Sequence, residues 1–161
     1  VGAFPNSMKL LKDKNIIDDL KEHCFKKKPF LGICLGMQMM FDYSTEIQKT
    51  NGLGLIEGKV EKLPENQITN SNFKIPNIGW YDLSINTKTN DKFFELKASS
   101  FYFVHSFHCI PKNNDVILYY SNFNQYKFCA AVAYENLVGF QFHPEKSRSQ
   151  GLNLMKNFTR M

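Results

Sequence analysis

The segment Phe30-Leu31-Gly32-Ile33-Cys34-Leu35-Gly36 is the feature that most limits how this chain can fold. Its short apolar run follows Pro29 and ends at a glycine-flanked cysteine, which predicts a buried parallel strand over 30–33. The residues from Met37 to Tyr43 then predict a helix. A sharp strand-to-helix turn holds its central residue in a strained conformation, and flanking glycines allow close backbone approach. The pattern therefore predicts that Cys34 stands clear of the strand as a candidate nucleophile.

The predicted position of Cys34 also bears on its reactivity. At a helix N-terminus, free N–H groups and the helix dipole favour the thiolate and lower a cysteine pKa from its usual value of about 8.5. The alternative is a buried cysteine in a glycine-containing turn. The five residues Gly32 to Gly36 alone leave both interpretations open. The four cysteines, Cys24, Cys34, Cys109 and Cys129, are widely spaced and form no CxxC pair, which favours reduced thiols in a cytoplasm.

Charge and hydropathy disfavour several classes of protein. The 161 residues carry a formal charge of +5, but only Arg148 and Arg160 among the basic residues are arginines, and the lysines are scattered. Nucleic-acid-binding proteins depend on clustered patches and arginine forks, so we interpret the lysines as a solvated surface. The longest apolar stretch, 128–134, is far shorter than the ~18 residues of a membrane span, and no secretory signal opens the sequence.

The hydrophobic period along the chain predicts one domain over 1–161, with a βα first half and a second half richer in strands. Asn6 or Ser7 is a candidate cap for a first helix, a second helix carries Ile16, Ile17 and Leu20, and a final helix carries Leu152, Met155 and Phe158. The polar stretches 65–72 and 86–92 are predicted loops. Strands are predicted at 59–63, 101–105, 116–121, 128–134 and 138–142.

A second chemical motif ends the last predicted strand, in the run Gly139-Phe140-Gln141-Phe142-His143-Pro144-Glu145. Pro144 favours an extended conformation at His143, and residues two apart in an extended segment point the same way. A carboxylate beside an imidazole fixes its tautomer and stabilises its charged form. Cys34, His143 and Glu145 therefore form a candidate triad for nucleophilic acyl chemistry.

These motifs resemble the class I (triad) glutamine amidotransferases and, within them, the glutaminase subunits of imidazole glycerol phosphate synthases. The resemblance implies an α/β, flavodoxin-like fold with three layers, in which helices flank a mostly parallel central sheet and the site lies at the carboxyl ends of the strands. It runs over nearly the whole chain, through the segments 1–4, 28–38, 52–56, 76–80, 102–106 and 141–147.

The resemblance implies a role for each triad residue. Cys34 would attack the carboxamide of glutamine, His143 would protonate the departing ammonia and later activate water, and Glu145 would orient His143. The oxyanion of the thioester-forming step would be held by the backbone amides of Leu35 and of the strand that begins at Val1-Gly2. The family has Pro-Gly before that Val, so we expect that an upstream segment with the first strand is missing from this sequence.

The substrate-holding residues also follow from the resemblance. Gln38 would hydrogen-bond the amino-acid end of glutamine, and the backbone at Ser106 and Phe107 would receive its α-carboxylate. Phe107 replaces a tyrosine that is usual in the family, which affects glutamine affinity only if that hydroxyl is used. Glu46 is a weaker candidate for glutamine binding.

The resemblance further implies a heterodimer. Trp80, Tyr102 and Lys146 would face a (β/α)₈-barrel synthase subunit, which receives ammonia through a tunnel. No cofactor and no metal are expected. His105, His108 and Cys109 have side chains that suit zinc, but the sequence has no fourth ligand at a local spacing.

Other functions remain open at this point. A paralogous subunit could supply ammonia for amidation of a surface-polysaccharide sugar, because the same triad serves both uses. A γ-glutamyl hydrolase or cysteine peptidase could use the triad without a partner. A non-catalytic binding module would have a degraded triad, whereas all three residues are present here.

Overall fold

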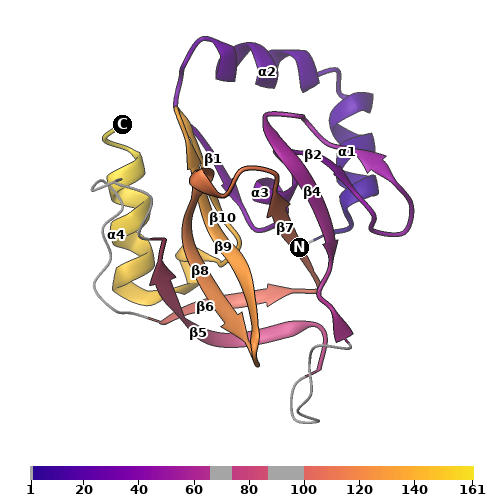
Figure 1. Cartoon of the computed structure of the whole chain (residues 1–161). Coiled ribbons are helices and arrows are strands. Elements are labelled where there is room, and N and C mark those ends of the chain that lie inside the picture. Colours follow the sequence, from indigo (N-terminus) through magenta and orange to yellow (C-terminus); the bar gives the residue numbers. More distant parts are fainter. Residues whose placement is uncertain (1, 66–73, 87–99) are drawn as a thin grey trace.

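The computed structural model describes residues 2–65, 74–86 and 100–161 (Figure 1). Its helices are α1 (Phe4–Asp13), α2 (Ile17–Phe25), α3 (Leu35–Met39) and α4 (Arg148–Phe158), with short 3-10 turns at η3 (Asn114–Val116) and η4 (Pro144–Lys146). Within the described residues, no helix is both long and apolar enough to cross a membrane. The predicted loops at 65–72 and 86–92 lie almost wholly outside the described residues.

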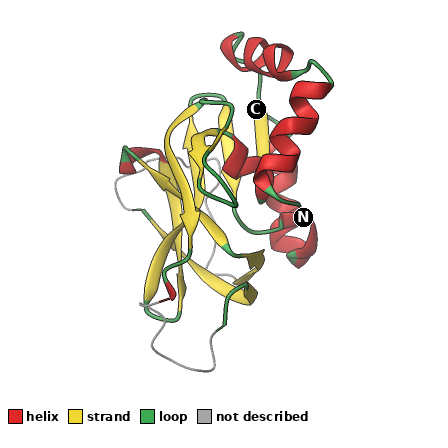
Figure 2. Ribbon diagram, turned by 90° about the vertical axis from the view of Figure 1, so that its right-hand side faces the viewer, coloured by secondary structure: helices red, strands yellow, loops and turns green. Residues whose placement is uncertain are grey.

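The described strands, which are yellow in Figure 2, form two sheets. One has the strand order β1-β10-β9-β8-β5-β6 and the other the order β3-β2-β4-β7. The bounds are β1 (Phe30–Ile33), β2 (Phe41–Ser44), β3 (Thr50–Asn51), β4 (Ile56–Lys62), β5 (Asn77–Ile85), β6 (Ser100–His105), β7 (Phe107–Pro111), β8 (Ile117–Phe123), β9 (Tyr126–Tyr134) and β10 (Leu137–Phe140).

The expectation of a mostly parallel three-layer sheet is wrong for this structure. Among the described strands, only the pairs β1–β10 and β2–β4 are parallel, and the other pairs are antiparallel. Tight turns at Asn124 and Glu135, both with positive φ, connect β8, β9 and β10 as antiparallel neighbours. A turn this short cannot supply the crossover that a parallel pair requires. Buried apolar runs look alike in both arrangements, so the sequence pattern did not separate them.

The helix predicted over 37–43 ends early, and Phe41–Ser44 is strand β2 instead. The carbonyl groups of Met39 and Met40 accept hydrogen bonds from the backbone amides of Leu53 and Leu55, both at 2.8 Å. A Cβ at Gly52 would lie 2.2 Å from the Phe41 carbonyl oxygen. The segment 52–55 therefore occupies the space and the hydrogen-bonding groups that a further turn of α3 would use.

The start of α1 is held by a distant residue and not by a local cap. Ala3 is the N-cap, with no capping side chain, so the predicted caps at Asn6 and Ser7 are wrong. The Glu46 carboxylate instead accepts a hydrogen bond from the Phe4 amide at 2.7 Å. A carboxylate at a helix N-terminus also complements the helix dipole.

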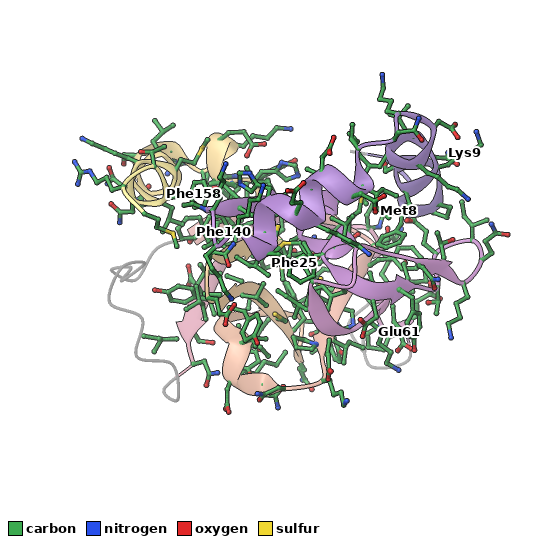
Figure 3. The ribbon with its side chains drawn as sticks, turned by 90° about the horizontal axis from the view of Figure 1, so that it is seen from above. Met8, Lys9, Phe25, Glu61, Phe140 and Phe158 are labelled. Carbon is green, nitrogen blue, oxygen red and sulfur yellow. The ribbon has the colours of Figure 1, made fainter. Side chains whose placement is uncertain are left out.

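Two buried clusters form the core on either side of β1 and β10. One includes Met8 of α1 and Phe41 of β2, and the other includes Phe103 of β6 and Phe140 of β10. Seen from above, α4 with Phe158 and α1 with Met8 lie at opposite sides of the molecule (Figure 3). The carboxyl ends of β1 and β10 meet because these strands are parallel neighbours, with Ile33 opposite Phe140.

Candidate active site

Cys34 occupies the predicted strand-to-helix turn. It lies directly after β1 and before α3, with φ 49° and ψ −107°, and its amide donates to the Phe140 carbonyl oxygen at 2.7 Å. A Cβ at Gly32 would come within 2.7 Å of the backbone of Gly36 and Met37, so this close approach requires glycine. A Cβ at Gly36 would meet nothing within 4 Å, so the expected steric reason for glycine holds only at the first position.

The thiol of Cys34 is less acidic than the sequence predicted. Burial raises its pKa, although hydrogen bonds from the Leu35 amide and the Gln141 side chain oppose the rise. The residue is only 8% exposed, and α3 has five residues. Desolvation disfavours the charged form and here outweighs the short helix. The expectation of a lowered pKa in the resting protein is therefore wrong.

His143 and Glu145 are in contact, as the spacing predicted. Nδ1 of His143 lies 2.6 Å from Oε1 of Glu145, and His143 is extended while Glu145 lies in η4. The expectation that both residues are extended is wrong, because a 3-10 turn brings the carboxylate to the imidazole. Since a carboxylate only accepts, Nδ1 carries the proton and Nε2 of a neutral ring has the free lone pair. Within the described residues, Nε2 is buried with no hydrogen-bond partner.

The turn that carries His143 and Glu145 is fixed by Ser147 and β6. The Ser147 hydroxyl donates to the His143 carbonyl oxygen at 2.6 Å and accepts from the Tyr102 amide at 3.0 Å. The His143 amide donates to the Tyr102 carbonyl oxygen at 2.9 Å. A Cβ at Gly151 of α4 would lie 1.9 Å from the Pro144 carbonyl oxygen, so α4 packs directly on this turn. The sequence did not single out Ser147.

A cavity of about 260 Å³ lies beside Cys34. It brings together the described residues that the sequence assigned to the oxyanion or to glutamine; Val1 lies outside the described residues. Such a volume suits a small metabolite better than a drug-sized ligand. The lining residues are Gly2, Cys34, Leu35, Gln38, Glu46, Pro76, Val104, His105, Ser106 and Phe107.

Two of the polar lining side chains already have protein partners. Gln38 Nε2 donates to the Phe107 carbonyl oxygen at 2.9 Å and to Gln141 Oε1 at 3.1 Å. Glu46 holds the Phe4 amide, two residues after Gly2 of the lining. Glu46 is therefore placed to position the segment that carries Gly2.

His105 on β6 and His108 on β7 are both buried. His105 Nδ1 donates to the Phe107 carbonyl oxygen at 2.9 Å, and its Nε2 lies 3.0 Å from Asn77 Nδ2. Burial lowers the pKa of His105 to about 3 and that of His108 to about 4. The part of the chain that the structure describes contains no group of three side chains able to hold a metal ion. The described cysteines are free thiols, and all four are buried.

Trp80, Tyr102 and Lys146 lie together on one face. Trp80 and Tyr102 are paired across β5 and β6, with ring centroids 5.9 Å apart, and Lys146 Nζ lies 5.8 Å from the Tyr102 ring. The Arg148 guanidinium lies 4.7 Å from the Trp80 ring, which the sequence did not predict. Trp80 is 43% exposed. Tryptophan and arginine are enriched at protein–protein interfaces, so the exposed Trp80 with Arg148 over its ring suits a protein-binding surface.

The glutamine amidotransferase class-I family matches residues 5–161 of the chain. The imidazole glycerol phosphate synthase subunit HisH of Aquifex aeolicus (strain VF5) is 42% identical over 161 residues, with 99% of this chain and 74% of that protein covered. The protein of the same name from Pyrococcus furiosus is 43% identical over 162 residues, with 99% and 76% covered.

Solved structures of low sequence identity have a similar fold. A structure described as glutamine amidotransferase has a TM-score of 0.63 at 16% identity and covers 98% of this chain and 76% of its own. The structure of PurLQS from Thermotoga maritima has a TM-score of 0.63 at 20% identity, with 90% and 67% covered.

Proposed function

Because the chain belongs to the class I glutamine amidotransferases, we propose that it hydrolyses glutamine to glutamate and ammonia as the glutaminase subunit of an imidazole glycerol phosphate synthase. The observation that carries this proposal is that Cys34 directly follows β1, while the hydrogen-bonded His143–Glu145 pair follows β10, the parallel neighbour of β1. The proposed unit is one domain over 1–161, and its proposed location is the cytoplasm.

The first half of the reaction forms a thioester. Cys34 Sγ gives its proton to His143 Nε2 and bonds to the carboxamide carbon of glutamine, whose oxygen becomes an oxyanion. The tetrahedral intermediate collapses, the C–N bond breaks, and the imidazolium returns the proton to the departing ammonia. Burial raises the pKa of the resting thiol, so Sγ needs a base to take its proton before it can attack. Glu145 holds the imidazole by its Nδ1 and stabilises its charged form.

The second half releases glutamate. Water loses a proton to His143 Nε2 and attacks the thioester carbon, after which the C–S bond breaks and Sγ leaves with the proton. The net change is glutamine plus water to glutamate plus ammonia. The Leu35 amide and the backbone at Val1-Gly2 are the proposed oxyanion donors. Gly2 and Leu35 line the same cavity as Cys34, which supports these assignments.

The cavity beside Cys34 is the proposed glutamine site. Gln38, Glu46, Ser106 and Phe107 all line it, in agreement with their assignment to substrate binding. The side chain of Phe107 has no hydroxyl, but its carbonyl oxygen already accepts two hydrogen bonds, from Gln38 and His105. The backbone of this position is thus fixed without the tyrosine that is usual in the family.

The ammonia acceptor is proposed from the relatives, which are named as subunits of imidazole glycerol phosphate synthase. The partner would be a (β/α)₈-barrel subunit that docks on the face of Trp80, Tyr102 and Lys146 and receives the ammonia for histidine biosynthesis. Arg148, stacked on Trp80, extends this proposed interface. The proposed reaction needs no cofactor.

The test is a comparison of two nitrogen sources in the complex of full-length protein with its barrel subunit. Cys34→Ala should abolish imidazole glycerol phosphate synthesis from glutamine, yet leave synthesis from added ammonium salt at alkaline pH intact. Loss of both activities would mean that Cys34 holds the fold or the interface. Robust glutamine-dependent synthesis in the variant would refute the proposed nucleophile.

A further inference from the structure

Gln141 is a buried polar side chain next to the nucleophile. It is 0% exposed, and its Nε2 lies 3.7 Å from Cys34 Sγ, within hydrogen-bonding range for sulfur. Gln141 follows β10 directly, and its amide donates to the Ala130 carbonyl oxygen at 2.9 Å. Its backbone is therefore held in the sheet, and its side chain contacts the sulfur on which the reaction depends.

The orientation of the Gln141 carboxamide is determined by its neighbour. Gln38 Nε2 donates to Gln141 Oε1 at 3.1 Å and to the Phe107 carbonyl oxygen at 2.9 Å. Both contacts need the donor nitrogen of Gln38, so the Gln141 oxygen must face Gln38. The Gln141 nitrogen is consequently directed at Cys34 Sγ.

Cys34 Sγ accepts a hydrogen bond from Gln141 and, as a thiol, can also donate one. Cys34 Sγ lies 3.8 Å from the Val104 carbonyl oxygen, which can accept the thiol proton. The Gln141 N–H can bond the sulfur before and after that proton leaves. A hydrogen bond to an ionised acceptor is stronger than one to a neutral acceptor, so the interaction strengthens as the thiolate forms.

We propose that Gln141 is a positioning residue for the nucleophile, which orients Cys34 Sγ and stabilises its thiolate through an N–H donor that Gln38 holds in place. The inference rests on the proposed function, since it assigns Gln141 to the same reaction. This role explains why the fully buried Gln141 side chain lies between Gln38 and Cys34 Sγ.

Several other groups act on Cys34. Burial raises the pKa of the thiol, the Leu35 amide and Gln141 lower it, and the Glu145 carboxylate raises it. His143, beside Glu145, is the proton acceptor of the proposed reaction.

From β6, His105 is a neutral neighbour, because burial lowers its pKa to about 3. From β7, Cys109 is also neutral, because burial raises its pKa well above the usual range. Gln141 is thus the only side chain among those named as acting on this thiol that favours its charged form by a hydrogen bond.

The test measures the thiol directly in the full-length protein. Iodoacetamide alkylation of Cys34 is followed by mass spectrometry between pH 6 and 10.5 in three proteins: the unsubstituted chain, Gln141→Met and Gln141→Glu. Met has similar length and no donor, so the midpoint of the rate should rise by about one pH unit, equivalent to a tenfold lower rate at neutral pH. Glu adds a negative charge and should raise the midpoint further.

Gln125→Met is the matched control, because Gln125 is exposed in the turn between β8 and β9. It should leave the Cys34 midpoint unchanged. In the complex, Gln141→Met should lower kcat for glutamine hydrolysis by about tenfold and change KM by less than about threefold, the pattern of a lost transition-state interaction. Unchanged midpoints in both folded Gln141 variants would overturn the proposal.

A measurement on the unsubstituted protein covers the case in which the variants do not fold. The ¹⁵N resonance of the Gln141 side-chain amide should shift with the same pH midpoint as Cys34 alkylation, and Cys34→Ser should remove that shift. An amide that does not respond to the thiol would overturn the proposal. These readouts need no glutamine, so they decide the role of Gln141 even if the chain proves not to hydrolyse glutamine.

Discussion

The two halves of the candidate active site are held in place by different means. On the nucleophile side, Cys34 has φ 49° and depends on the close backbone approach at Gly32. On the imidazole side, His143 has an extended backbone and is tied to Ser147 and Tyr102 by hydrogen bonds. The first half is positioned by backbone strain and close packing, and the second by a polar network.

The two halves of the site should therefore be sensitive to different kinds of substitution. Added volume should damage the nucleophile side, because close-packed backbone cannot make room for it. Removal of a single hydrogen-bonding group should damage the imidazole side, because it leaves a buried polar group without a partner. The halves are joined by the backbone hydrogen bond from Cys34 to Phe140.

The largest effect should come from Glu145→Gln on the imidazole side. The substitution keeps the size of the side chain but removes the charge that stabilises the imidazolium, so kcat for glutamine hydrolysis should fall by about 10³-fold or more. The measurement is steady-state glutamate release by the complex. Glu135→Gln, which removes only a surface ion pair with Lys27, is the control and should leave kcat unchanged. A fall of less than tenfold for Glu145→Gln would contradict the assigned role.

A pH effect should come next, from two buried imidazoles: His105, which lines the cavity beside Cys34, and His108 on β7. Burial lowers the pKa of His105 to about 3 and of His108 to about 4, whereas both have the ordinary pKa of about 6.5 in the unfolded chain. The unfolded state therefore binds more protons below pH 6.5, and stability falls as the pH falls from about 6.5 toward 4. From pH 7 to pH 5, each imidazole should cost up to about 2 kcal/mol of unfolding free energy.

Urea unfolding at pH 7, 6 and 5 checks this expectation. His108→Gln should reduce the loss of stability between pH 7 and 5 by about half, because one of the two imidazoles is gone. An identical pH dependence in the variant would show that His108 takes a proton as easily in the folded protein as in the unfolded chain.

Gly32 and Gly36 provide a matched pair on the nucleophile side. Gly32→Ala should destabilise the protein by about 3 kcal/mol or more, because the new Cβ would come within 2.7 Å of backbone atoms. Gly36→Ala should change stability by less than about 1 kcal/mol, because its Cβ has open space in α3. Unfolding free energies from urea titration compare the two, and equal losses would contradict the packing at Gly32.

The smallest effect should come from Ser147→Ala. It removes the donor to the His143 carbonyl oxygen and the acceptor of the Tyr102 amide, which should cost about 1–3 kcal/mol of stability. The sharper check is kinetic: kcat should fall with little change in the alkylation rate of Cys34, since only the imidazole side is loosened. A parallel drop in alkylation would show that the two halves are not held independently.

Much of this site could be predicted from local sequence. The Cys34 turn depends on Gly32 four residues before Gly36, and the His143–Glu145 contact joins residues two apart. Gln141 belongs to the same motif, two residues before His143, but its contact with Cys34 joins residues 107 apart. Ser147 and Arg148 carried no comparable signal, because their partners Tyr102 and Trp80 are brought to them by the fold.

Local sequence was enough to place most strands and helices, the strained turn at Cys34 and the pairing of His143 with Glu145. These features depend on side-chain period and on steric rules that act over a few residues. Three features could be read only from the folded chain: most described strand pairs are antiparallel, α3 ends at Met39, and burial raises the pKa of Cys34. The reason is physical: these outcomes depend on partners distant in the chain, as with Gln141, which contacts Cys34 across a separation of 107 residues.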